Sequence, residues 1–243
     1  MLNAVSPIDG RYEKKTTHLQ EYFSEYALIK YRVGVEVEYL IELINSDIPQ
    51  LSELKSKVAE IQQIKANFTQ EDALAIKNIE KTTNHDVKAV EYFIKDRMTQ
   101  LGLTAHLEWI HFALTSQDIN NTATPVMIKD YLNQSYFPET EALVQTLKNL
   151  ASDYHGIPIL SRTHGQAASP STVGKEILVF IERLELQIEQ LKSVSIKAKF
   201  GGATGNFNAH KVAFPDKDWQ KFADKFINRL GLERSQYTTQ IAH

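Results

Sequence analysis

The sequence predicts an all-α protein. Apolar residues recur at steps of three and four through most of the 243 residues, which is the spacing of one buried helix face. Glycine and proline, with 10 and 7 copies, are spaced far apart and leave long uninterrupted stretches for helices. A domain boundary is expected near residue 113, which divides the chain into residues 1–112 and 113–243.

The first long helix is expected from Ser24 to Ser46. Its stretch VGVEVEY also alternates with the period of a strand, but the flanking residues favour a helix. A second apolar stripe, from Val87 to Leu101, predicts another helix. The positions expected to be buried in these two helices are Leu28, Ile29, Val33, Val37, Leu40, Ile41, Ile44, Val87, Val90, Phe93, Ile94, Met98 and Leu101.

Three more helices are predicted in the second half of the chain. Residues 136–155 and 217–230 have the helical pattern. The segment from Thr172 to Lys199 has no proline, and no glycine after Gly174, and predicts a helix of roughly 25 residues. Such a length is typical of a bundle core. The sequence leaves open whether its apolar face is buried within the chain or against another subunit.

The composition excludes several classes of protein. With 42% hydrophobic residues, 23% charged residues and a net charge of −3, the chain lacks the basic stripe of a nucleic-acid binder. No apolar run approaches the ~18 residues of a membrane span, and the amino terminus lacks a signal pattern. We therefore expect neither a nucleic-acid nor a membrane partner. The absence of cysteine excludes disulfides and thiolate nucleophiles and suits a cytoplasmic location.

Polar residues concentrate at three loop-to-helix junctions. Hydroxyl and carboxylate side chains three residues apart are typical helix caps. A helix amino terminus also presents unpaired N–H groups that suit phosphate or carboxylate, so capping and ligand binding both stay open. The junctions carry the pairs Thr83 with Asp86 and Thr115 with Asp118, and the run Pro170, Ser171 and Thr172.

No metal site, nucleotide loop or activated nucleophile is predicted. None of the 8 histidines belongs to an HExxH pair, and His106 and His111 are five residues apart, which does not put them on one helix face. The glycine cluster GGATGN at residues 201–206 lacks the GK[ST] ending of a phosphate loop and follows a predicted helix, so a helix-ending turn is favoured. No GxSxG elbow occurs.

His164 presents two alternatives. It lies among small and hydroxylated residues in the stretch SRTHGQAASPSTVGKE, residues 161–176. Histidine is the usual general acid near neutral pH. Spacing alone does not decide between a reactive acid and a polar residue in a turn.

Six motifs occur in order along the chain, namely AVSPIDGRY (4–12), TTNHDVKAVEYF (82–93), HFALTSQDINN (111–121), SRTHGQAASPSTVGKE (161–176), GATGNFNAH (202–210) and YTTQI (237–241). Together they closely resemble the adenylosuccinate lyases of the branch found in many bacteria, within the fumarase/aspartase superfamily. The resemblance covers almost the entire chain, and six coincident motifs are far more specific than one. The stretches DGRY and NHDVKAVE point to this branch rather than to argininosuccinate lyase or fumarase.

The resemblance implies a C–N lyase of purine nucleotide synthesis, on the routes to IMP and AMP. Its reaction is a β-elimination that releases fumarate from adenylosuccinate to give AMP, and from the succinylated aminoimidazole carboxamide ribotide (SAICAR) to give the carboxamide (AICAR). The reaction needs no metal or organic cofactor. The implied fold is a small amino-terminal helical domain, here residues 1–112, followed by a central long-helix bundle domain, here residues 113–243. The implied assembly is a cytoplasmic homotetramer in which three chains build each active site.

The resemblance also assigns roles to residues of this sequence. His164 matches the THGQ motif of the family and is the implied general acid. Lys88 adds positive charge near this set, or is an ordinary solvated residue of a helix face. The implied substrate-binding positions are Arg11 and Tyr12 for the phosphate, Asn84, His85 and Asp86 along the pocket, Thr115 and Ser116 for a carboxylate, and Gln240.

One feature of the family has no match in these 243 residues. The signature loop S-S-x-M-P-x-K-x-N, which supplies the serine that acts as general base, does not occur. We therefore expect the chain to be an amino-terminal portion, inactive alone, whose bundle domain is incomplete at its carboxy-terminal end. Two alternatives stay open: another lyase of the superfamily, such as argininosuccinate lyase, and a non-catalytic helical scaffold or binding module.

Overall fold

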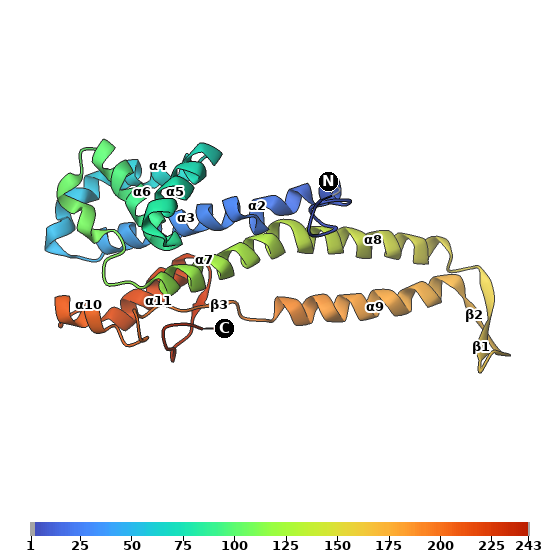
Figure 1. Cartoon of the computed structure of the whole chain (residues 1–243). Coiled ribbons are helices and arrows are strands. Elements are labelled where there is room, and N and C mark those ends of the chain that lie inside the picture. The colour runs from blue at the N-terminus through green and yellow to red at the C-terminus, as the bar shows by residue number, and fades with distance from the viewer. Residues whose placement is uncertain (1–2, 243) are drawn as a thin grey trace. The chain divides into compact units, whose positions relative to one another are not determined.

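The computed structural model describes residues 3–242 and is mostly helical, which confirms the predicted all-α class (Figure 1). The chain divides into two compact units. The core unit comprises the residues up to Lys129 and those from Ile196 onward, and the hairpin unit comprises Asp130–Ser195. The predicted domain boundary at residues 112 and 113 falls in a loop of the core unit and stays a prediction. No helix in residues 3–242 combines the length and the hydropathy that a bilayer span requires.

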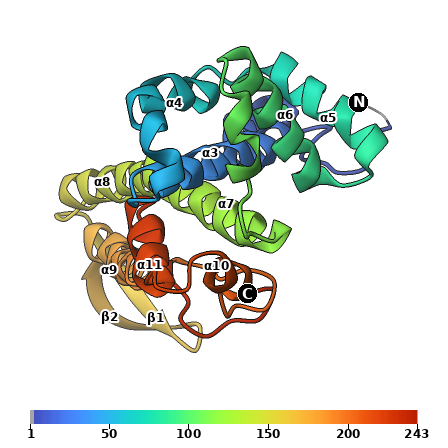
Figure 2. The same cartoon turned by 90° about the vertical axis from the view of Figure 1, so that its left-hand side faces the viewer.

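Helix α3 (Glu25–Ile44) is central to the core unit, and α4 and α6 pack against it (Figure 2). Ser24 caps the helix, because its hydroxyl accepts a hydrogen bond from the Ala27 N–H at 3.1 Å. The helix predicted from Ser24 to Ser46 is therefore confirmed. Its buried residues occupy almost every side of the second half of the helix. This all-round burial explains why VGVEVEY lacks a clear helical stripe.

The other predicted helices of the core unit are also present. Helix α6 (Asp86–Gln100) buries the apolar stripe that begins at Val87. Helix α5 (Gln70–Thr83) lies beside it. The remaining elements are α1 (Glu13–Thr16), η1 (Thr17–Leu19), α2 (Gln20–Phe23), η2 (Pro49–Lys57), α4 (Val58–Ala66), η3 (Thr104–Trp109), α7 (Ser116–Tyr131), α10 (Asn208–Ala213), α11 (Trp219–Arg229) and the short parallel strands β3 (Lys197–Ala198) and β4 (Glu233–Arg234).

Aromatic side chains from distant parts of the chain meet at Tyr39 of α3. The Tyr39 ring lies 5.7 Å from the ring of Phe226 and 5.4 Å from that of Phe200. Phe226 belongs to α11, whose bounds confirm the helix predicted over 217–230. Trp219 begins the same helix and is fully buried. This packing fixes the carboxy-terminal segment of the core unit against α3.

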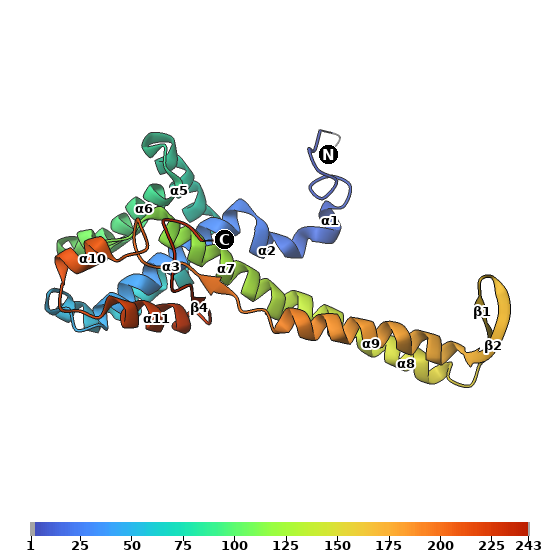
Figure 3. The same cartoon turned by 90° about the horizontal axis from the view of Figure 1, so that it is seen from below.

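The hairpin unit contains two antiparallel helices that lie side by side, α8 (Phe137–Asp153) and α9 (Val173–Lys192) (Figure 3). A π-helical turn, η4 (Leu132–Tyr136), precedes α8. The helices meet closely at Gly174, where a Cβ atom would lie 2.3 Å from the Ala151 carbonyl oxygen. Only a few side chains are buried between them, namely Val144, Ala151, Ile181 and Ile188.

The loop of this unit is a β-hairpin, which the sequence did not predict. Strands β1 (Pro158–Thr163) and β2 (Gln166–Thr172) pair in antiparallel register. Thr172 caps α9, as expected, but Pro170 and Ser171 belong to the strand. The predicted end of this helix at Lys199 was also wrong, because α9 ends at Lys192. The run Ser193 to Ser195 has low helix propensity, and the next residues form β3.

Candidate functional site

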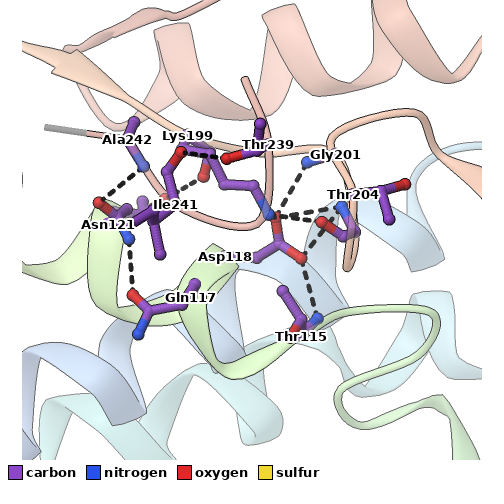
Figure 4. Close-up of polar contacts among 12 residues, drawn as sticks. Thr115, Gln117, Asp118, Asn121, Lys199, Gly201, Thr204, Thr239, Ile241 and Ala242 are labelled. Atoms are coloured by element: carbon purple, nitrogen blue, oxygen red, sulfur yellow. Dashed lines mark hydrogen bonds and ion pairs between the residues drawn. The ribbon is translucent and has the colours of Figure 1, made fainter.

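The buried carboxylate of Asp118, in the first turn of α7, gathers four hydrogen-bond donors (Figure 4). Lys199 Nζ lies 2.7 Å from Asp118 Oδ1, and both side chains are 0% exposed. The backbone N–H groups of Gly201 and Gly202 donate to the same carboxylate at 2.9 and 3.1 Å. The Thr115 N–H donates to Asp118 Oδ2 at 2.9 Å, which confirms the predicted capping role of Asp118.

The glycine cluster at residues 201–206 is a turn packed against this carboxylate. The prediction that this cluster ends a helix was wrong, because α9 stops nine residues before Gly201 and strand β3 lies between them. Its amides at Gly201 and Gly202 already bind Asp118. A Cβ atom at Gly205 would lie 2.2 Å from the Thr238 carbonyl oxygen, so glycine is required for close approach. The turn therefore holds an internal carboxylate rather than presenting these two amides to a phosphate.

The carboxy-terminal motif YTTQI lies beside this turn. Thr238 contacts it at Gly205, and the Ala242 N–H donates to Asn121 Oδ1 of α7 at 3.4 Å. Asn121 also accepts the Lys199 N–H through its backbone carbonyl at 3.2 Å. Gln240, a predicted substrate contact, is exposed on this segment. Three motifs far apart in sequence thus meet at the start of α7.

The junction between α5 and α6 differs from the predicted capping pair. His85, not Thr83, is the N-cap of α6, and its Nδ1 accepts from the Lys88 N–H at 3.2 Å. Asn84 ends α5 in the left-handed conformation at φ +49°, which asparagine tolerates. Thr83 is therefore the last residue of α5, and Asp86 is the first residue of α6. Asn84 and His85 are exposed, and Asp86 is half-buried.

Arg32 of α3, which sequence reasoning missed, links this junction to α7. Its guanidinium lies 2.7 Å from Asp86 Oδ2, and its Nε donates to Asn120 Oδ1 at 2.8 Å. Burial tends to raise the pKa of Asp86, but the Val87 N–H and the Arg32 charge lower it below the usual value. Asp86 is therefore an anion that orients Arg32. Nothing in the local sequence marks Arg32, since both partners are distant in the chain.

A second set of missed residues holds the loop before α7. His111, at φ +59°, donates through Nδ1 to the buried Glu36 of α3 at 2.5 Å. Burial tends to lower the pKa of His111, but Glu36, with two further carboxylates, raises it above the usual value. The Tyr39 hydroxyl donates to the Phe112 carbonyl at 2.8 Å. Helix α3 thus fixes the loop that leads to Thr115.

Thr115 and Ser116 lie half-buried at the start of α7. Within residues 3–242, neither hydroxyl has a hydrogen-bond partner in the chain. Lys88, which lies on the exposed face of α6, pairs with Glu91 at 2.8 Å, as its solvated helix-face interpretation expects. The hydroxyls and the helix terminus can donate hydrogen bonds to a carboxylate.

The remaining predicted site residues are Arg11, Tyr12 and His164. Arg11 and Tyr12 are exposed before α1, with the Arg11 guanidinium 5.5 Å from the Tyr12 ring. His164 belongs to the hairpin unit, on the two-residue turn between β1 and β2. His164 and Gly165 both have positive φ, at 50° and 76°, as in the tight turns typical of β-hairpins. The turn exposes the imidazole to solvent. No three His, Asp or Glu side chains in residues 3–242 form a group that could hold a metal ion.

Solved structures share this fold at low sequence identity. The 3-carboxy-cis,cis-muconate lactonizing enzyme from Pseudomonas putida matches with a TM-score of 0.71 and 19% identity, over 91% of this chain and 49% of that chain. A fumarate lyase from Mesorhizobium sp. BNC1 matches with the same TM-score, identity and coverage. Both support the helical-bundle fold expected from the sequence.

Sequence comparison finds relatives of higher identity than these solved structures. Adenylosuccinate lyase from Dictyostelium discoideum is 52% identical over 100% of this chain and 54% of that protein. The enzymes of that name from Haemophilus influenzae and Escherichia coli K12 are 47% and 46% identical, over 99% of this chain and 53% of each. The chain spans about half the length of the curated relatives it matches. A family model described as "Lyase" matches residues 10–243, and the chain therefore belongs to this lyase family.

Proposed function

We propose that this chain belongs to an adenylosuccinate lyase, which eliminates fumarate from adenylosuccinate to give AMP and from SAICAR to give AICAR. The similarity to proteins of that name along the whole chain carries this proposal. The meeting of the TSQDINN, GGATGN and YTTQI motifs at one helix terminus supports it. The proposal places the protein in purine nucleotide synthesis in the cytoplasm, with no cofactor.

The substrate is recognised through its negative charges. Thr115 and Ser116 hold one carboxylate with their hydroxyls and the positive end of α7. Asn84, His85 and Asp86 line the pocket beside them, since Arg32 links Asp86 to α7. Arg11 and Tyr12 hold the phosphate, and Gln240 contacts the substrate from the carboxy-terminal segment.

The chemical step is a β-elimination with two proton transfers. A base removes a proton from Cβ, the electron pair forms the C=C bond of fumarate, and the C–N bond breaks with its electrons moving to nitrogen. His164 protonates that nitrogen as general acid. No stretch of the 243 residues matches the serine loop of the family, so the proposed base lies outside them and this chain alone is inactive.

The proposed assembly is a homotetramer with shared active sites. Its support is the apolar surface of the hairpin unit, where Leu178, Phe180 and Leu186 of α9 are more than half exposed. Exposed apolar faces of this kind mark subunit interfaces. In this proposal α8 and α9 join long helices of other subunits.

The test uses the complete gene product. Adenylosuccinate and argininosuccinate are offered separately, and the products are separated by chromatography. We expect AMP and fumarate from the first and no cleavage of the second, together with a tetramer in sedimentation. Cleavage of argininosuccinate alone would favour another lyase of the superfamily. A protein that binds AMP but converts neither compound would favour a non-catalytic helical module.

A further inference from the structure

Asp118 and Lys199 form an ion pair with no exposed side-chain surface, and neither side chain reaches the surface that Thr115 and Ser116 present. We propose that the two are positioning residues, which fix the start of α7 so that Thr115 and Ser116 can bind a substrate carboxylate. This inference rests on the proposed function, because it concerns the same site. Neither residue touches the substrate.

The pair connects the residue before α7, the first turn of α7 and the glycine turn. The Asp118 carboxylate accepts from the N–H of Thr115, the residue just before α7, and from the N–H groups of Gly201 and Gly202 in the glycine turn. Lys199 Nζ contacts the same turn, because it donates to the Gly202 carbonyl at 2.5 Å as well as to Asp118. A displacement of the turn is therefore transmitted directly to the Thr115 backbone (Figure 4).

The backbone of Lys199 extends the same connection to the carboxy-terminal segment. Its N–H donates to the Asn121 carbonyl, and the Asn121 side chain accepts from Ala242. Its carbonyl accepts from the Thr122 hydroxyl at 3.4 Å. One buried lysine thus fixes the register between α7, the turn and the segment that carries Gln240.

The charges of the pair matter as well as the contacts. A buried carboxylate without its cation keeps a large desolvation cost, so removing one partner alone destabilises the fold. Replacement of both Asp118 and Lys199 by neutral residues of similar size removes this desolvation cost. They also lose the charge-assisted bonds that orient the amides. The double substitution therefore separates positioning from simple stability.

The experiment measures fumarate and AMP binding by calorimetry in the complete gene product. The variant is the double substitution Asp118→Asn with Lys199→Met, after circular dichroism has shown that it folds. We expect fumarate affinity to fall by about tenfold to a hundredfold, as for a misplacement of about 1 Å. AMP affinity should change by no more than about twofold, since its phosphate is assigned to Arg11 and Tyr12.

Lys197→Met is the matched control. Lys197 is an exposed lysine on β3, two residues before Lys199. Its substitution should leave both affinities unchanged. A folded double variant with wild-type fumarate affinity would overturn the inference. So would an equal loss of fumarate and AMP affinity, because that pattern reports a general disturbance of the fold.

Hydrogen exchange tests the inference on the wild type if the double variant does not fold. The amides of Thr115, Gly201 and Gly202 share one acceptor, so we expect them to exchange as one unit. A Thr115 amide that exchanges more than about tenfold faster than the two glycines would overturn the positioning role. A wild type that binds no fumarate would overturn the proposed function instead, while the exchange pattern still decides whether the segments move together.

Discussion

The core unit and the hairpin unit reach a stable fold by different means. The core unit buries aromatic and aliphatic side chains around α3, together with ion pairs such as Lys199 with Asp118. The hairpin unit buries few side chains between two helices and leaves Phe180 and Leu186 exposed. A two-helix unit of this kind is marginal in isolation. The core unit therefore covers most of its apolar side chains itself, whereas the hairpin unit leaves large apolar side chains of α9 uncovered.

The same difference separates the candidate functional residues. In the core unit, Asp86 and Thr115 are held by the buried residues Arg32 and Asp118. His164 is held only by the geometry of a two-residue turn. The candidate substrate-binding residues Asp86 and Thr115 are thus anchored to a packed core, whereas the proposed acid His164 lies on an exposed hairpin turn.

The largest expected effect contrasts one aromatic residue from each unit. Trp219→Ala should lower the free energy of unfolding by about 3–5 kcal/mol, because the side chain is fully buried and its Nε1 donates to the Phe214 carbonyl. Phe180 is 60% exposed, so Phe180→Ala should cost less than ~0.5 kcal/mol in a dilute monomer. Urea unfolding followed by circular dichroism measures both.

The state of assembly of the Phe180→Ala variant tests the same contrast between the two units. If the proposed tetramer covers Phe180, its substitution should shift the assembly towards smaller species in sedimentation velocity. A Phe180→Ala variant that assembles as the wild type does would contradict the view that the hairpin unit is completed by another subunit.

The second prediction concerns turnover. In the complete gene product, His164→Asn should lower kcat by roughly 10²- to 10⁴-fold, the usual contribution of a general acid. AMP affinity and unfolding should hardly change, because the side chain is exposed. His155→Asn is the matched control, since His155 is another exposed histidine of the hairpin unit. Near-normal turnover of the His164 variant would remove its assigned role.

Periodic patterns predicted most of the helices of both units. Helices α3, α6, α8 and α11 begin and end within a few residues of the expected bounds, because each buries a regular face or is buried all round. The hairpin of β1 and β2 was missed because its strands are exposed and have no apolar alternation. Its one local signal is the His164–Gly165 pair, which allows a tight turn.

The candidate site was predictable only where a motif marked it. Thr115 and Ser116 were found through their motif, and the Asp118 cap through its spacing. Arg32 and Lys199 were not, since each pairs with a residue more than fifty positions away. Such pairs are set by tertiary packing, and a single sequence has no local pattern that reports them.

The third prediction tests how the core unit depends on pH. Burial lowers the pKa of His210 to about 4, and its Nδ1 has no hydrogen-bond partner in residues 3–242. An unfolded histidine has a pKa near 6.5, so the unfolded state binds more protons between these values. Stability should therefore be retained above about pH 6.5 and lost as the pH falls towards 4, by about 3 kcal/mol in total.

His210→Gln removes this titration. Urea unfolding of the wild type and the variant between pH 4 and 7 isolates the contribution, because all other groups are common to both. The wild type should lose more stability than the variant on acidification. Parallel pH profiles would show that His210 is not buried in its neutral form.

The smallest effects come from one substitution made in each unit. Gly174→Ala should destabilise the hairpin unit by about 1–3 kcal/mol, because its Cβ would overlap the Ala151 carbonyl, a backbone atom that cannot turn away. Gly34→Ala in α3 meets nothing within 4 Å and should stabilise the core unit by about 0.5–1 kcal/mol. Opposite signs in thermal unfolding would establish that α8 and α9 meet at Gly174 in solution. If both variants were stabilised, the two helices would have to be further apart at Gly174, and the side chains buried between α8 and α9 would pack too loosely to order the hairpin that carries His164.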